Sequence, residues 1–174
     1  MPLSSSPPFT VALAKGALSL QALEQAMIAG KILCYAQGFA LIVAASKEFG
    51  WNLPLPAIAR VWREGCIIRS SMLNDMATAL EENPERGLML APFFVDHLRR
   101  ASPGLRQVVS LGAAQGLPLP ALSAGLAWFD MMRTGRGTAN MIQAQRDFFG
   151  AHGFERLDKP GQRDLHGPWG GHMA

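Results

Sequence analysis

The stretch that decides the fold is residues 19–50, SLQALEQAMIAGKILCYAQGFALIVAASKEFG. Ser19 is a typical helix N-cap and Gly50 a typical C-terminal stop. About thirty residues that rise about 1.5 Å each make a helix on the order of 45 Å long. The large apolar residues recur every three or four positions, which predicts one apolar helical stripe made of Leu20, Leu23, Met27, Ile28, Ile32, Tyr35, Phe39 and Ile42.

Small residues are frequent along this predicted helix. They leave room for a neighbouring backbone, although each glycine lowers helix propensity by about 1 kcal/mol. We therefore expect other helices to approach closely at Gly30, Ala36, Gly38, Ala44 and Ala45.

Prolines and glycines divide the rest of the chain into shorter helices. The run WNLPLP (51–56) ends the long helix, and Pro84, SPG (102–104) and QGLPLP (115–120) predict further breaks. No stretch alternates apolar and polar residues for long enough to indicate a strand. The fold class is all-α, with about seven helices around one long helix; the shorter ones are expected over 58–63, 67–82, 89–99, 105–114, 122–133 and 139–149.

The composition is typical of one globular domain. Of the 174 residues, 49% are hydrophobic, which is enough for a core, and 17% are charged. We expect an irregular segment over 1–18, a helical domain over 19–157 and an extended tail rich in glycine and proline over 158–174. FTVALA (9–14) is too short for a signal peptide, and no segment approaches the roughly 20 apolar residues of a membrane span. A cytoplasmic protein that binds no membrane is expected.

The charges and aromatic residues do not indicate a nucleic-acid surface. The net charge of +3 comes from basic residues that are scattered, with no run longer than Arg99-Arg100. The four tryptophans do not alternate with basic residues, so they are expected in the core or at interfaces. Cys34 and Cys66 have no Cys-x-x-Cys spacing and are predicted to be reduced core residues. No metal site is expected, because the spacing of His97, His166 and His172 does not suit one.

Polar residues concentrate in ANMIQAQRDFFGAHGFER (139–156). On a helix, Gln143, Arg146 and either Phe149 or Gly150 share one face, and His152 follows the helix end. An arginine and a histidine in this arrangement suit a phosphorylated or carboxylated ligand, an acidic residue of a neighbouring subunit, or a structural salt bridge. Spacing alone does not decide among the three.

Several stretches, in order, resemble one known family. They are KILCYAQGFALI (31–42), IARVWREGCIIRSSML (58–73), PFF (92–94), G-x-P-x-P (116–120) and ANMIQAQRDFFGAH (139–152). Over residues of about 21 to 170 the chain closely resembles the C-terminal helical domain of 6-phosphogluconate dehydrogenase. The resemblance implies an all-α domain with an extended C-terminal tail, from homodimeric enzymes of the pentose phosphate pathway. Those enzymes oxidatively decarboxylate 6-phosphogluconate to ribulose 5-phosphate with NADP.

The resemblance also implies roles for individual residues. The arginine of QRD and the histidine of GAH, here Arg146 and His152, bind the substrate phosphate in the active site of the partner subunit. The tail is expected to cross onto that partner, with His166 and Trp169 as its anchors. The chain has GAHGFER where the family usually has GAHTYER, and two extra residues lie between Gly161 and His166. These departures leave the phosphate-binding pair in place.

The family's redox machinery has no counterpart in this sequence. No Gly-x-Gly-x-x-Gly turn follows a strand, so no dinucleotide site is expected. The family's catalytic lysine and glutamate lie in a K-M-x-H-N-G-I-E-Y type motif, and neither Lys15 nor Lys31 has that context. We therefore expect no catalytic residue, no cofactor bound by this chain and no turnover by the chain alone; NADP belongs to the intact family enzyme.

Three functional hypotheses remain. The first is the substrate-phosphate-binding and dimerisation part of a 6-phosphogluconate dehydrogenase, as a homodimer or with the missing N-terminal half. The second is a non-catalytic dimerisation or regulatory module that pairs with a full-length relative, and the third is a helical domain with a structural Arg-His pair. The resemblance implies that Arg63 and Arg69 pair with acids such as Glu64 or Asp75, with contact to a ligand as the alternative. Solvated or helix-helix positions are expected for Asp130, Arg133 and Asp147.

Overall fold

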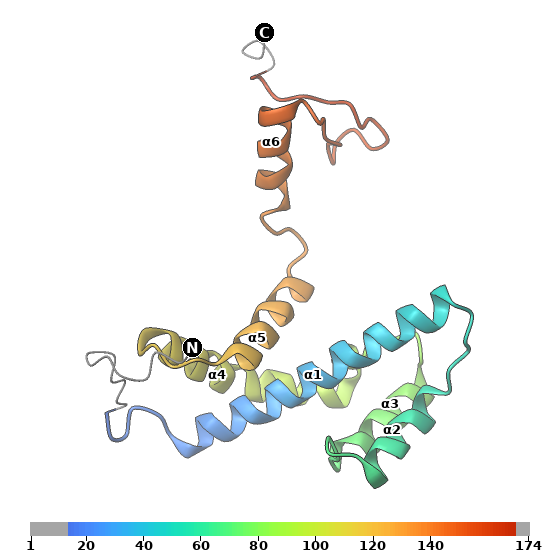
Figure 1. The fold of residues 1–174 in the computed structure, drawn as a ribbon, viewed down its shortest axis with the longest axis vertical. Coiled ribbons are helices and arrows are strands. Elements are labelled where there is room, and N and C mark those ends of the chain that lie inside the picture. The colour runs from blue at the N-terminus through green and yellow to red at the C-terminus, as the bar shows by residue number, and fades with distance from the viewer. Residues whose placement is uncertain (1–13, 170–174) are drawn as a thin grey trace, which may run out of the picture. The chain divides into compact units, whose positions relative to one another are not determined.

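The computed structural model describes residues 14–169, and this part of the chain is helical (Figure 1). Between residues 14 and 169 there are only two isolated β-bridges and no strand. The predicted all-α class is therefore confirmed. The elements are α1 (Leu20–Glu48), α2 (Leu55–Gly65), α3 (Met72–Glu82), the 3-10 turn η1 (Leu88–Leu90), α4 (Pro92–Ala114), α5 (Pro120–Arg133) and α6 (Ala139–Gly150).

The chain forms two compact units, one ending at Phe129 and one beginning at Asp130. The first holds α1 to α4 and most of α5, and the second holds α6 and the segment after it. The predicted irregular segment over 1–18 lies mostly outside the described residues. The boundaries expected from the sequence, 19–157 and 158–174, stay a prediction.

The long helix α1 has the caps that the sequence predicts. The Ser19 hydroxyl accepts a hydrogen bond from the Ala22 N–H at 3.1 Å, and the Phe49 N–H donates to the Ala45 carbonyl at 2.9 Å. The face that α1 buries is partly different from the predicted stripe, since Leu20 is 86% exposed and Met27 is 55% exposed. At this end the buried residues are alanines instead, namely Ala22, Ala26 and Ala29.

The alanines of α1 are buried because α4 packs closely against this helix. A Cβ atom built on Gly104 of α4 would lie 2.5 Å from Cβ of Gln25 and 2.8 Å from the Ala22 carbonyl oxygen. The expectation of close approach at small residues also holds at Gly30, where a Cβ would lie 2.6 Å from Leu122 Cδ2. The expectation fails at Gly38, because no atom of a neighbouring element lies within 4 Å of a Cβ built there.

Helix α4 continues through Pro103, so the break predicted at SPG is wrong. Proline inside a helix costs about 3 kcal/mol or more, because a backbone hydrogen bond is lost and the ring meets the preceding turn. Leu98, Leu105 and Val108 of the same helix are buried in the core, and each buried side chain of this kind contributes about 1.5–3 kcal/mol. This burial offsets the cost of the proline.

The core of the first unit lies between α1, α4 and the packed helix pair α2 and α3 (Figure 1). Trp62 of α2 packs on Phe39 of α1, with ring centroids 5.2 Å apart. Helix α3 begins five residues later than predicted, and the Tyr35 hydroxyl donates a hydrogen bond to the Ile68 carbonyl in the loop before it. The largest fully buried apolar side chains are Phe39, Phe94, Ile32, Leu33, Leu73, Met76 and Leu105.

Two further expectations from the sequence need correction. Within the described residues, α1 is long and apolar enough to cross a membrane by length and composition, although the sequence analysis expected no such segment. Of its most apolar window, 44% is buried inside the protein, as in a core helix. Cys34 and Cys66 are free thiols as predicted, but they are not core residues, since Cys34 of α1 is exposed and Cys66, at the end of α2, is half-buried.

The close contact between α1 and α4 predicts that a glycine-to-alanine substitution in a helix, which usually stabilises, will destabilise the domain. Gly104→Ala should destabilise the domain by about 1–3 kcal/mol, because the new methyl group meets the backbone of α1. Gly38→Ala is the matched control and should stabilise by up to about 1 kcal/mol, since its surroundings are open and alanine favours helix. Urea unfolding followed by circular dichroism measures both. Equal stabilisation by the two substitutions would contradict the packing described here.

Candidate functional site

The candidate site lies at the C-terminal end of α6, in the second unit. The helix ends at Gly150, and Ala151 follows in the left-handed conformation with φ of 50°. The Ala151 N–H donates to the Asp147 carbonyl at 2.8 Å, which closes the last turn. Gly153 also has a positive φ, 68°, which suits glycine. His152 therefore lies in a tight turn between two left-handed residues.

A buried carboxylate organises the residues around this turn. Asp147 is 1% exposed and accepts four hydrogen bonds. Its Oδ1 accepts from the Gly153 N–H at 2.9 Å and from His166 Nδ1 at 2.6 Å. Its Oδ2 accepts from the Gly167 N–H at 2.9 Å and from Trp169 Nε1 at 2.8 Å. The carboxylate thus joins α6, the turn after it and residues 166–169.

This arrangement corrects one expectation. Asp147 is neither solvated nor paired with another helix; its partners come from the segment that folds back over α6. His166 and Trp169 are both bound to Asp147 of their own chain, and their role as anchors on a partner stays a prediction. The physical reason is that a buried carboxylate requires several donors, and these residues supply them locally.

The same contacts set the pKa of Asp147. Burial by itself raises the pKa, because it disfavours the charged form. The hydrogen bonds from Gly167, His166, Gly153 and Trp169 act in the opposite direction and hold the pKa of Asp147 well below its usual range. Asp147 is therefore ionised in the folded unit, and its four hydrogen bonds stabilise the ionised form.

The lowered pKa of Asp147 predicts acid sensitivity of this cluster. Its folded pKa lies below the unfolded value of about 3.9, so its contribution to stability is present above about pH 4 and is lost as the pH falls further. The Trp169 indole N–H resonance should keep its folded position down to about pH 4 and change below it. A change centred near pH 6.5 would contradict this prediction, because a histidine would then control the cluster.

Arg146 and His152 are both exposed. The Arg146 guanidinium has only a long hydrogen bond to Gln143 Oε1, at 3.4 Å, and no carboxylate of residues 14–169 lies within ion-pair distance of it. The imidazole of His152 lies over the end of α6, so that a Cβ atom on Gly150 would be 2.9 Å from Nε2. The guanidinium is therefore available to an anion from outside this part of the chain.

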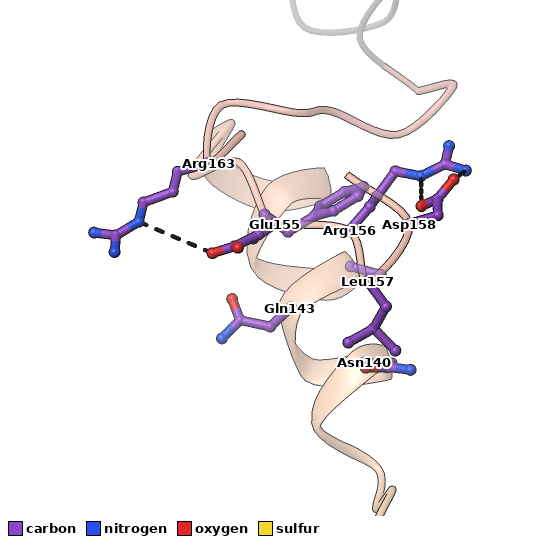
Figure 2. Close-up of a pocket in the computed structure, with 9 residues that line it drawn as sticks. Asn140, Gln143, Glu155, Arg156, Leu157, Asp158 and Arg163 are labelled. Atoms are coloured by element: carbon purple, nitrogen blue, oxygen red, sulfur yellow. Dashed lines mark hydrogen bonds and ion pairs between the residues drawn. The ribbon is translucent and has the colours of Figure 1, made fainter. Parts of the chain in front are cut away.

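A hollow of about 590 Å³ lies beside α6 (Figure 2). Its two arginines are already paired with carboxylates: Arg156 donates to Asp158 at 2.8 and 2.7 Å, and Arg163 lies 3.9 Å from Glu155. Neither Arg146 nor His152 lines this hollow, which is therefore distinct from the candidate site. Its lining residues are Asn140, Gln143, Ala144, Phe154, Glu155, Arg156, Leu157, Asp158 and Arg163.

Two other arginines considered in the sequence, Arg63 and Arg69, have different surroundings. Arg63 lies 3.8 Å from Glu64, as expected, whereas no ion pair among residues 14–169 joins Asp75 to Arg63 or Arg69. Arg69 lines an apolar hollow of about 610 Å³ beside α1. The second unit's Asp130 and Arg133 pair with each other at 3.2 Å along α5.

Two arrangements typical of cofactor and metal sites are absent from the described residues. From residue 14 to 169 there is no parallel strand followed by a helix, which is the unit that binds a pyrophosphate. This same range contains no group of three or more His, Cys, Asp or Glu side chains that suits a metal ion.

Comparison with known proteins identifies the family. Residues 6–169 match the model for the 6-phosphogluconate dehydrogenase C-terminal domain. A decarboxylating 6-phosphogluconate dehydrogenase of Treponema pallidum is 47% identical over 87% of this chain and 31% of its own length. An NAD(+)-dependent, decarboxylating 6-phosphogluconate dehydrogenase of Bacillus subtilis is 46% identical over 82% of this chain and 31% of its own length.

A solved structure gives the same result. The Plasmodium falciparum 6-phosphogluconate dehydrogenase, described in apo form and with NADP+ or 6-phosphogluconate, matches with a TM-score of 0.83 and 36% identity. The match covers 91% of this chain and 34% of that enzyme, and the chain spans about a third of the length of the curated relatives. With its helical fold and its sequence both matched, the chain belongs to the 6-phosphogluconate dehydrogenase family, as its C-terminal domain.

Proposed function

We propose that this chain is the substrate-phosphate-binding and dimerisation part of a 6-phosphogluconate dehydrogenase. The complete enzyme would oxidatively decarboxylate 6-phosphogluconate to ribulose 5-phosphate and CO2 in the cytoplasm. The observation that carries the proposal is the exposed Arg146 guanidinium, which lacks a carboxylate partner in residues 14–169 and lies at the helix end that His152 follows.

The chemistry of these two side chains suits a phosphate monoester. A guanidinium presents a fixed fork of N–H donors that matches two phosphate oxygens and stays charged at all relevant pH values. The imidazole adds a donor from the adjacent turn. Both groups would increase the affinity for the phosphate end of the substrate, while the reacting carbons lie elsewhere. They would therefore act mainly on KM.

The remaining functions belong to another part of the enzyme. NADP, or NAD as in the name of the Bacillus relative, would be held by the remaining two-thirds of such an enzyme, together with the catalytic lysine and glutamate. We propose that Arg146 and His152 reach into an active site of the partner subunit and that the chain alone does not turn over. Neither a membrane nor a nucleic acid is part of this proposal.

Exposed apolar side chains support assembly with a partner. Leu20, Leu23 and Met27 form an exposed row on α1, and Phe149 of α6 is 71% exposed. Large apolar side chains gathered on a surface favour association. The same observation supports the alternative function, a non-catalytic dimerisation or regulatory module that pairs with a full-length relative.

A chimera tests the proposed function. In the chimera, the matching C-terminal third of the Bacillus subtilis relative is replaced by this chain. The name of that relative specifies both the substrate and NAD(+). We expect the chimera to reduce NAD+ only when 6-phosphogluconate is present, and the isolated chain to show no turnover. A folded chimera that binds NAD+ but does not oxidise 6-phosphogluconate would contradict the substrate-binding role and favour the regulatory module.

A further inference from the structure

The buried carboxylate of Asp147 lies between the two proposed phosphate ligands in the sequence. Arg146 precedes it on α6, and His152 follows it within the turn that its hydrogen bonds hold. Asp147 itself is not available to a ligand, because it is 1% exposed and all four of its partners are groups of this chain. A role in the site therefore has to act through its neighbours.

The turn that carries His152 is fixed from both sides by Asp147. The backbone carbonyl of Asp147 accepts from the Ala151 N–H at 2.8 Å, and its side-chain Oδ1 accepts from the Gly153 N–H at 2.9 Å. These two N–H groups flank His152. Ala151 is held at a φ of 50°, which non-glycine residues seldom adopt, so the turn depends on these contacts.

The end of α6 sets how the imidazole lies. Gly150 has no side chain, and a Cβ atom at this position would lie 2.9 Å from Nε2 and 3.0 Å from Cδ2 of His152. The imidazole therefore occupies space that any other residue at position 150 would fill. Its position follows from two features, the glycine beneath it and the turn that Asp147 holds.

The same carboxylate sets the orientation of the helix that carries Arg146. Adjacent helical residues project about 100° apart, so the buried direction of Asp147 turns Arg146 outward. Hydrogen bonds from His166, Gly167 and Trp169 fix that buried direction against residues 166–169. Asp147 thus fixes the backbone that carries both proposed phosphate ligands, without contact with the phosphate.

We propose that Asp147 is a positioning residue, which together with Gly150 holds Arg146 and His152 as a preformed pair for a phosphate monoester. The inference rests on the proposed function, since it concerns the same site. A preformed pair loses less conformational freedom on binding than two mobile side chains, and this raises affinity without a new contact.

The test measures 6-phosphogluconate binding to the full chain by NMR titration, with the Trp169 indole resonance as a report on the folded segment. The isolated chain provides only part of the complete site, so we expect a Kd on the order of millimolar, lost in Arg146→Ala. Gly150→Ala should raise that Kd about tenfold while the indole resonance stays unchanged, because alanine favours the helix but displaces the imidazole.

Two further variants complete the test. Gly125→Ala in α5 is the matched control, because no side chain or neighbouring helix lies within 4 Å of the added Cβ; it should leave the Kd unchanged. Asp147→Asn keeps the shape of the side chain but turns an amide toward donors that need an acceptor, so it should raise the Kd and shift the indole resonance.

The outcomes separate this inference from the proposed function. Binding that depends on Arg146 but is equal in Gly150→Ala, Asp147→Asn and the unsubstituted chain would overturn the positioning role and leave the proposed function standing. An unsubstituted chain that binds no 6-phosphogluconate would overturn the preformed pair, whereas the proposed function is decided by the chimera. A Kd raised in Gly150→Ala alone, with Asp147→Asn unchanged, would overturn the role of Asp147.

Discussion

Arg146→Ala should raise the KM of the chimera for 6-phosphogluconate about 100-fold and change kcat by less than about twofold. The guanidinium is proposed to contribute a charged, two-pronged contact to the phosphate, and loss of such a contact typically costs a few kcal/mol of binding. The folded state should be almost unaffected, because the side chain is exposed and its one hydrogen bond, to Gln143, is 3.4 Å long. Steady-state kinetics and thermal unfolding measure the two effects.

Two further substitutions sharpen this result. Arg146→Lys keeps the charge but loses the fork, so its KM should lie between those of the unsubstituted chimera and Arg146→Ala. Arg136→Ala removes the same charge from an exposed position outside the proposed site and should leave the KM unchanged. If Arg146→Ala instead unfolds the second unit, Arg146 is a structural residue and the phosphate-binding role fails.

Phe94→Ala should lower the free energy of unfolding by about 3–5 kcal/mol, the largest stability effect expected here. Phe94 is fully buried where α4 meets the core, and its removal leaves a cavity as well as lost apolar burial. A loss of this size is a large fraction of the roughly 5–15 kcal/mol that stabilises a typical domain. Urea unfolding followed by circular dichroism measures it.

The matched control for this substitution is Phe49→Ala. Phe49 is 64% exposed and makes a ring contact with Trp51, so its removal should cost less than about 1 kcal/mol. Equal losses for Phe49→Ala and Phe94→Ala would show that the core is not centred on α1 and α4 as described.

The helices were largely predictable because their signals are local. Ser19 caps α1 as its residue type predicts, and five of the six α-helices were located apart from their ends, while α4 was predicted as two helices. The burial pattern was less predictable, because it depends on the partner helix. Gly104 lets α4 approach so closely that the alanines of α1 face it, while the larger Leu20 stays exposed. Helix α4 also continues through Pro103, because residues on both sides of the proline are buried in the core.

The candidate site was predictable only in part. Arg146 and His152 were named from their resemblance to a family motif, and their role in phosphate binding stays a prediction. Asp147 was missed, because its partners are 6 to 22 residues away in a segment without regular secondary structure. No spacing rule connects an aspartate to Gly167 or Trp169.

The central claim is that Arg146 and His152 serve the active site of a partner subunit. Two chimeras test it when they are co-expressed with different tags and purified as a mixed dimer, one carrying Arg146→Ala and the other an inactivated cofactor-binding part. A dimer of either chimera alone should be impaired. In the mixed dimer, the subunit with Arg146→Ala keeps an intact cofactor-binding part, and its partner supplies an intact Arg146 to that part. We expect its KM for 6-phosphogluconate to return to that of the unsubstituted chimera, with about half the kcat per dimer. A mixed dimer with the raised KM of Arg146→Ala would contradict the account.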